Sequence, residues 1–299
     1  MRLEMTSSAF LSGNWQERLN ACRTFTDSAG FEFGIQLHNT ASSEQIDTLG
    51  KTGIVLSAHG PLNQRKNWNL ATRKTAETFR AIDENIRLFE RLKIDRIVFH
   101  GAMMSDECPD AFGHGKSYHE AMAPVFRPEL ALFEGQMYNS DFTNLPEFAG
   151  RMALLKENLE VLRVRYPGFL LCLENDFPAY GSAGMFFHDI GRLGHPLCLD
   201  TGHLWIAAHL MDRDFHAEIG TALRSGNVRM CHFHASVYDN SIPKNKWSDG
   251  HKKLSTPNPK MNLPRVAKKI LRGGVDNFVL EIPEGSVEDL KTLHQWLTE

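Results

Sequence analysis

Short apolar runs alternate with longer helical patterns along the whole chain, and this alternation constrains the fold more than any other feature. The runs lie at residues 1–7, 31–38, 53–60, 95–101, 168–175, 196–201, 228–235 and 278–284. The segments between them carry apolar residues at three- and four-residue steps, as in NWQERLNACRTFTD and RMALLKENLEVLRVRY. Strands that alternate with helices predict a parallel sheet with helical crossovers.

Eight such units, with no GxGxxG turn after any strand, favour a closed (β/α)8 TIM barrel over an open sheet. A chain of 299 residues is a usual length for one barrel, so we expect a single domain over residues 1–299. The link between residues 38 and 53 is short for a full helix, which predicts an abbreviated unit there. Residues 102–150 form a long insertion with a predicted helix over 119–136. An insertion after a barrel strand lies on the catalytic face, as a lid or as a structural cap.

Composition excludes some classes of protein. The formal net charge of −3 gives no overall basic field for nucleic acid, although a local basic groove stays open. No apolar run reaches the roughly 18 residues of a membrane helix, and MRLEMTSSAF lacks a signal-peptide core. The five cysteines form no CxxC pair, so we expect free thiols and a cytoplasmic protein. No membrane association and no protein partner is implied.

Six consecutive runs end in residue types that bind metal ions. These are His59, His100, Glu174, Asp200, the pair His232 and His234, and Glu281. In a parallel barrel the carboxyl ends of the strands meet at one mouth, so these side chains would share one volume. Any one of these residues alone is most simply explained as a hydrogen-bonded structural residue. Three carboxylates in one cavity, however, repel one another unless a cation neutralises their charge. No run ends in Arg or Lys, so a divalent metal is the predicted counter-ion.

Three further residues would reach the same mouth. His203 lies three residues after Asp200, where the strand turns into the helix HLWIAAHLM. Asp249 and His251 form a D-x-H pair in WSDGHKK, after the seventh run. Such a pair is ordinary in a solvated loop, but at a barrel mouth it would complete a second or third metal site. Histidine and carboxylate ligands without cysteine suit Zn²⁺, with Mn²⁺ or Co²⁺ as alternatives.

The motifs SAHGP, VFHG, CLEN, CLDTGHL, HFHAS, SDGH and LEIPE, in this order over about residues 53–284, resemble those of the xylose-isomerase-like TIM-barrel superfamily. Within it they are most similar to the endonuclease IV branch (AP endonuclease family 2), which holds three zinc ions. The resemblance implies one ion held by His59, His100 and Glu174. It implies a second ion, shared through Glu174 and held also by Asp200, a strand-seven histidine and Glu281, and a third held by His203, Asp249 and His251.

Both histidines of HFH face the mouth, and His234 is favoured as the ligand. Related epimerases use the second histidine of a similar motif, and this one lies nearer the mouth, which would leave His232 behind the metal. The chain also departs from the endonuclease pattern. In that branch a proline usually follows the strand-four histidine, but here His100 is followed by glycine in HGAM. Val237 stands three residues after His234, where the branch usually has an acidic residue. The insertion over 102–150 is absent from the short DNA-repair enzymes.

The loop LNQRKNWNL corresponds to the segment that wedges into DNA in those enzymes. Arg65, Lys66 and Trp68 would there touch phosphates and stack on a base, or the loop is a plain surface loop.

Two activities fit these residues. The first is a multinuclear zinc phosphodiester hydrolase of the endonuclease IV type, acting on abasic DNA or another small phosphoester, in which the metals activate water. The second is a sugar or sugar-phosphate isomerase or epimerase, in which Glu174 and Glu281 are catalytic and move a proton on opposite faces of an enediol. An isomerase needs one four-ligand site and has no use for His59, His100 and the D-x-H pair. Their presence favours phosphoester chemistry, and a barrel that binds metal or ligand without turnover is a third alternative.

Overall fold

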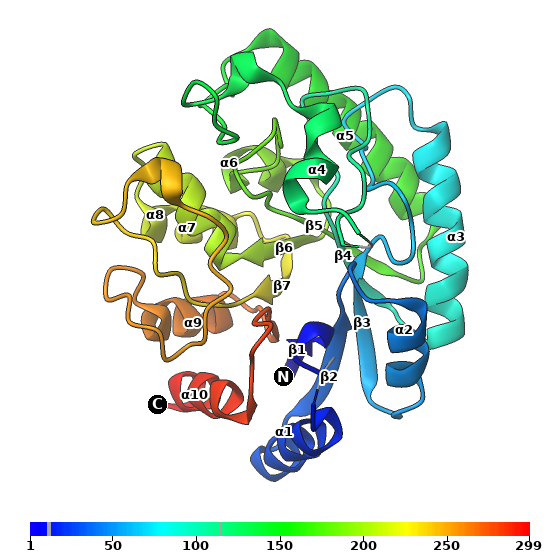
Figure 1. Ribbon diagram of the computed structural model, residues 1–299, viewed down its shortest axis with the longest axis vertical. Coiled ribbons are helices and arrows are strands. Elements are labelled where there is room, and N and C mark those ends of the chain that lie inside the picture. The colour runs from blue at the N-terminus through cyan, green and yellow to red at the C-terminus, as the bar shows by residue number, and fades with distance from the viewer. Residues whose placement is uncertain (11–12, 114) are drawn as a thin grey trace.

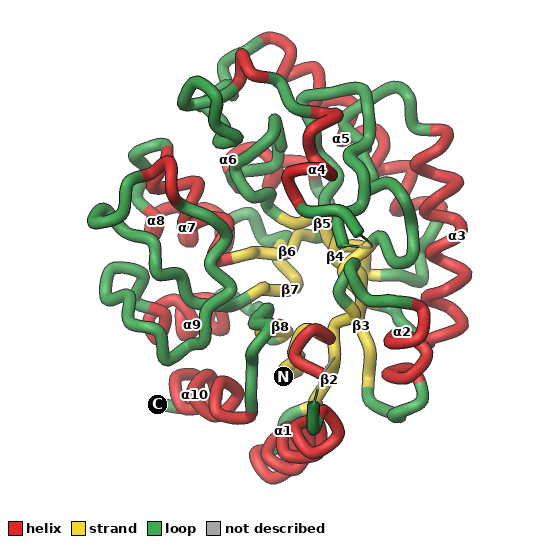
Figure 2. Tube along the Cα trace, viewed as in Figure 1, coloured by secondary structure: helices red, strands yellow, loops and turns green. Residues whose placement is uncertain are grey.

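The computed structural model describes residues 1–10, 13–113 and 115–299 (Figure 1). It confirms the predicted α/β barrel: eight parallel strands close in chain order, and Figure 2 shows the strands as an inner ring surrounded by helices. The strands are β1 (Arg2–Thr6), β2 (Glu32–Leu37), β3 (Val55–Gly60), β4 (Arg96–Phe99), β5 (Leu170–Glu174), β6 (Leu197–Asp200), β7 (Val228–His232) and β8 (Asn277–Leu280). No helix among the described residues is long and apolar enough to cross a bilayer.

Helices of very different length connect the strands. They are α1 (Trp15–Ala29), α2 (Ser43–Gly50), α3 (Ala76–Leu92), α4 (Tyr118–Met122), α5 (Pro146–Arg165), α6 (Phe187–Ile190), α7 (Thr201–Leu210), α8 (Phe215–Arg224), α9 (Leu263–Arg272) and α10 (Val287–Thr298). The eight residues of α2 confirm the abbreviated second unit. Helices α1 and α10 pack together and bring the two ends of the chain near each other.

The predicted helix over 119–136 is wrong. Helix α4 ends at Met122, and only two short 3-10 segments follow it, Ala123–Val125 and Pro128–Leu130. Proline has no backbone N–H and clashes with the preceding helical turn, so Pro124 and Pro128 prevent a continuous helix. The insertion is therefore mostly loop, which lets it follow the surface of the barrel.

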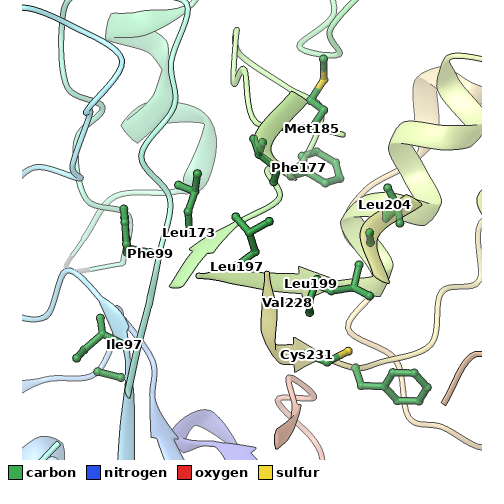
Figure 3. Packing of buried hydrophobic residues seen from close by; sticks show 14 of the residues in the cluster. Ile97, Phe99, Leu173, Phe177, Met185, Leu197, Leu199, Leu204, Val228 and Cys231 are labelled. Atoms are coloured by element: carbon green, nitrogen blue, oxygen red, sulfur yellow. The ribbon is translucent and has the colours of Figure 1, made fainter. Parts of the chain in front are cut away.

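Alternation along the strands sorts the buried residues into two layers. One face of each strand packs against the helices and contributes to the large apolar cluster shown in part in Figure 3, with Phe99, Leu173 and Leu199 among its members. The opposite face fills the barrel interior with a small cluster: Val98, Cys172, Cys198, Met230 and Val279. Because successive side chains alternate, the position two residues beyond each interior residue also points inward, toward the carboxyl ends of the strands.

His195, just before β6, provides a test of burial far from the barrel mouth. It packs edge-on against Phe99, and burial lowers its pKa to about 4. In the unfolded chain the His195 ring binds a proton below about pH 6.5, whereas in the native protein it stays neutral down to about pH 4. The native state is therefore progressively destabilised relative to the unfolded state as pH falls from about 6.5 toward about 4, and this penalty is absent above about pH 6.5. Between pH 7 and 5 we expect a loss of about 2 kcal/mol of unfolding free energy from this group.

Urea unfolding of His195→Gln at pH 7 and 5 measures this effect, and the variant should lose less stability across the interval than the wild type. The exposed His188→Gln variant is the control and should follow the wild type. Equal pH dependence in wild type and His195→Gln would contradict the assignment.

Candidate metal centre

Glu174 lies at the middle of the barrel mouth, and two strand-end histidines contact one of its oxygens. His59 Nε2 lies 3.1 Å and His100 Nε2 lies 3.4 Å from Glu174 Oε2. Each residue stands two positions after an inward-facing residue of its strand, which explains why strands far apart in sequence bring them together. One ligand atom from each of the three lies within 4.8 Å of the others, as a shared metal ion would require.

The second group surrounds His232 and is buried, with Glu281 at the cavity wall. His232 Nδ1 lies 2.7 Å from Glu174 Oε1, 3.2 Å from Glu281 Oε2 and 3.8 Å from Asp200 Oδ2. Candidate ligand atoms of these four residues lie within 4.8 Å of one another. Glu174 therefore belongs to both the first and the second group.

Both histidines of β7 and its extension lie beside these carboxylates, and His234 as the strand-seven ligand stays a prediction. His232 pairs in register with Asp200 on β6 and with Val279 on β8, so the strand ladder holds it at the level of the carboxylates. His234 follows the end of β7 and stacks on His251, with 4.4 Å between ring centroids. Its Nε2 lies 3.4 Å from Asp200 Oδ2, and it forms a candidate ligand group with His251 and Glu281.

The third group gathers on one oxygen of Asp249. His203 Nε2 lies 2.8 Å and His251 Nε2 lies 2.7 Å from Asp249 Oδ2. His203 is in the first turn of α7, where its backbone N–H donates to Asp200 Oδ1 at 2.6 Å as part of the helix N-cap. The helix start therefore ties the third group to the second.

Hydrogen bonds behind the histidines orient their rings. Nδ1 of His203 donates to the Asn175 carbonyl at 2.9 Å, and Nδ1 of His251 donates to the Glu281 carbonyl at 2.8 Å. His100 uses the same nitrogen toward Asp176 Oδ1 at 2.8 Å. Since a carbonyl oxygen only accepts, each ring presents Nε2 to the cavity, as metal-binding histidines do when a second partner fixes their orientation.

Charge in the mouth is balanced by protons on histidine. Burial alone would raise the pKa of Glu174, but His232 and His100 hold it well below its usual value. Asp249 behaves in the same way beside His251 and His203. Conversely, burial would lower the pKa of His251, yet Asp249 raises it to about 10. A cation bound here would replace these protons, so metal binding should release protons.

The donor set fits a divalent ion by a direct structural criterion. Asp200 Oδ2 and Asp249 Oδ1 are buried oxygens without a hydrogen-bond partner, which is costly for a carboxylate. Glu4, at the other end of the barrel, shows the contrast: Arg2 Nε lies 3.0 Å from its Oε1, and Ser57 and Asn277 donate to it. No arginine among the described residues lines the cavity beside the carboxylates at the mouth. Histidine with carboxylate oxygen suits zinc, manganese or cobalt.

The insertion closes the mouth into a cavity of about 540 Å³. Candidate ligands line its floor, and the insertion contributes apolar and aromatic walls: Met103, Phe112, Tyr118, Met122 and Met137. Phe112 packs edge-on against Tyr118, with 5.7 Å between ring centroids. No Lys or Arg is found among the described residues that line the cavity.

The loop that follows β3 is covered by the same insertion. Trp68 is 1% exposed and packs against Phe99 at the cavity wall, so almost none of its ring is available for the base stacking that the sequence allowed. Lys66 pairs with Asp110 of the insertion at 2.5 Å, and backbone hydrogen bonds join residues 65 and 67 to 111 and 109. Lys66 thus pairs with the insertion, and neither Arg65 nor Lys66 is among the described residues that line the cavity.

Two cavity residues were missed from the sequence. His38 directly follows β2 and lies 3.8 Å from Glu281 Oε1 through Nε2, and burial lowers its pKa to about 4. The strand-end pattern that identified His59 also applies to FEFGIQLH and could have found it. Asp176, which orients His100, carries no comparable signal because it lies in a loop after β5.

Comparisons with known proteins bear on the fold. No family model matches the chain, and no curated protein matches it in sequence. A D-tagatose 3-epimerase-like protein is 14% identical and superposes with a TM-score of 0.61 over 99% of this chain and 97% of its own. A family 2 AP endonuclease from Brucella melitensis is also 14% identical, with a TM-score of 0.52 over 96% and 95%. An epimerase-like protein and an endonuclease thus share this barrel, so the fold is compatible with more than one activity.

Proposed function

We propose that this protein is a metal-dependent phosphoester hydrolase of the xylose-isomerase-like superfamily, with a multinuclear centre at the barrel mouth. The observation that carries the proposal is a set of three neighbouring groups. Two share Glu174 and have candidate ligand atoms within 4.8 Å of one another. The third consists of His203 and His251 around Asp249 Oδ2 and is tied to the second by the start of α7. A one-metal isomerase would bind its ion in the group around His232. The other two groups would then bind no metal and have no role in the reaction.

The residues that would hold the ions follow from these groups. They are His59, His100 and Glu174; Glu174, Asp200, His232 and Glu281; and His203, Asp249 and His251. Zn²⁺ is the proposed metal, in up to three copies, with Mn²⁺ or Co²⁺ as alternatives. When bound, such ions polarise a phosphoryl oxygen and lower the pKa of water.

The protein's own part is to orient ligands and to enclose the substrate. The Asn175 carbonyl, Asp176 and the Glu281 carbonyl hold three histidine rings toward the cavity. Phe112 and Tyr118 of the insertion line the cavity, where they would limit the access of water to a bound substrate. Limited access of water strengthens electrostatic interactions within such a site.

The cavity favours a small phosphoester over abasic duplex DNA. About 540 Å³ is the size of a small-molecule site, and its apolar walls suit an organic substituent. A DNA backbone is normally bound by Lys and Arg, and none of the described lining residues supplies one. Trp68, the candidate stacking residue, is buried.

A sugar isomerase or epimerase is the second candidate, because the group around His232 contains the four ligands that such an enzyme would need. Proton transfer on both faces of a substrate would require Glu174 and Glu281 to reach it. Glu281 lines the cavity, whereas Glu174 is 0% exposed and lies beneath the histidines. This difference favours hydrolysis.

The test begins with elemental analysis of protein purified without chelator. We expect more than one zinc per chain, hydrolysis of bis(p-nitrophenyl) phosphate that chelation abolishes and zinc restores, and cleavage of abasic duplex DNA at least about tenfold less efficient. A single bound ion together with ketose epimerisation would overturn the hydrolase assignment in favour of the second candidate.

A further inference from the structure

The ring of His234 occupies a space that only glycine can leave open. Gly202 is the second residue of α7, and a Cβ built on it would lie 2.0 Å from Cε1 and 2.5 Å from Nε2 of His234. Real side chains essentially never approach so closely, so any other residue at position 202 must displace the ring. Glycine is unfavourable within a helix, and this contact accounts for its presence here.

Hydrogen bonding determines which nitrogen of His234 carries the proton. The backbone N–H of His251 donates to His234 Nδ1 at 3.0 Å. A nitrogen that accepts this bond cannot itself hold a proton, because two N–H groups would then face each other. The Ala235 carbonyl lies farther from the same nitrogen, at 3.3 Å. The proton of the neutral ring is therefore on Nε2.

The protonated nitrogen points between two ligand groups. His234 Nε2 lies 3.4 Å from Asp200 Oδ2 and 3.7 Å from Asp249 Oδ1. All three atoms are buried and lack a hydrogen-bond partner. The other oxygens of the two carboxylates are already engaged, Oδ1 of Asp200 by the His203 N–H and Oδ2 of Asp249 by His203 and His251.

We propose that His234 is a positioning residue that couples the second and third metal groups, and that Gly202 exists to admit its ring. The Nε2–H orients the free oxygen of Asp200 and the free oxygen of Asp249 and reduces the repulsion between these two like charges. His234, His251 and Glu281 also offer candidate ligand atoms within 4.8 Å of one another, and the proposal assigns His234 the positioning role because its Nδ1 already accepts the His251 N–H. The inference rests on the proposed metal centre and adds a role that the ligand set alone does not contain.

Four variants of the full-length protein test the proposal by zinc binding alone. His234→Leu removes the donor, Gly202→Ala displaces an intact ring, and His234→Gln retains one donor and one acceptor. Gly220→Ala is the matched control, because it is also a helical glycine but its Cβ would meet only the flexible ends of Arg224 and Lys269. Zinc stoichiometry and affinity are measured in competition with a chromophoric chelator, and circular dichroism checks folding.

We expect His234→Leu and Gly202→Ala to weaken the most loosely bound zinc by about 10- to 100-fold, the usual effect of losing a residue that orients metal ligands. His234→Gln should lie much nearer the wild type, and Gly220→Ala should match it. If Gly202→Ala does not fold, the difference in zinc affinity between His234→Leu and His234→Gln tests the proposal.

Three results would overturn the proposal, and they differ from one another. Equal loss of one ion in His234→Gln and His234→Leu would make His234 a ligand. Wild-type binding in His234→Leu would remove any role for the ring. A wild-type protein that binds no zinc would refute the metal centre itself, and this inference with it, whereas zinc binding without phosphoester hydrolysis would refute only the proposed activity.

Discussion

Glu174→Gln should lower kcat/KM for phosphodiester hydrolysis by about 10³-fold or more and remove at least one bound ion. Glu174 is the carboxylate that contacts both His232 and the pair His59 and His100. An amide keeps the shape but removes the negative charge. Charge stabilisation by a bound metal is worth several kcal/mol, and each 1.36 kcal/mol corresponds to about tenfold in rate. Steady-state kinetics and elemental analysis on the same preparation measure both effects.

The exposed helical variant Glu157→Gln makes the same chemical change away from the site and should leave both quantities unchanged. A Glu174→Gln protein with the full ion content and full activity would show that Glu174 does not join the two groups. Loss of activity with unchanged ion content would instead assign it a direct role in the chemistry, as in the second candidate.

The double variant Phe112→Ala, Tyr118→Ala should lower kcat/KM for bis(p-nitrophenyl) phosphate by roughly 10²-fold, mainly through a higher KM. The two rings form the aromatic wall that the insertion places over the cavity. Burying an aromatic substituent against such a wall contributes about 1.5 kcal/mol for each ring, and two rings give about 3 kcal/mol. Kinetics with the zinc-loaded protein at several substrate concentrations separate KM from kcat.

Phe126→Ala serves as the control for this variant. Phe126 is also an aromatic residue of the insertion and packs against Tyr180, but it is not among the residues that line the cavity. If the control and the double variant lose the same activity, the insertion is a structural cap, which was the other reading of the sequence.

The strand-end pattern identified most of the site because it depends on local sequence alone. Alternation along a strand places every second side chain on one face, so Asp200 and Glu281 follow from the interior residues Cys198 and Val279. Parallel pairing then brings the carboxyl ends of all strands to one mouth, and this does not depend on the exact register between neighbouring strands. The same rule applies to His38, which was overlooked although its run ends in the same way.

The choice between His232 and His234 could not come from alternation, since both side chains face the same way. The strand ladder places the two histidines differently: β7 ends at His232, whose partners are Asp200 on one side and Val279 on the other. Beyond that residue the chain leaves the sheet and places His234 against Gly202 and His251. The end of a strand depends on hydrogen bonds to neighbouring strands that are distant in sequence.

The sequence by itself determined the barrel and the chemical type of its mouth, because hydrophobic period and strand-end residues are local properties of the chain. Only the tertiary structure decided how deep each side chain lies and what covers the mouth. Asp110 of the insertion pairs with Lys66, and buried Tyr138 of the insertion donates to the Trp247 carbonyl. These contacts join segments tens of residues apart, and their free energy arises only once the barrel has brought both segments to the same end.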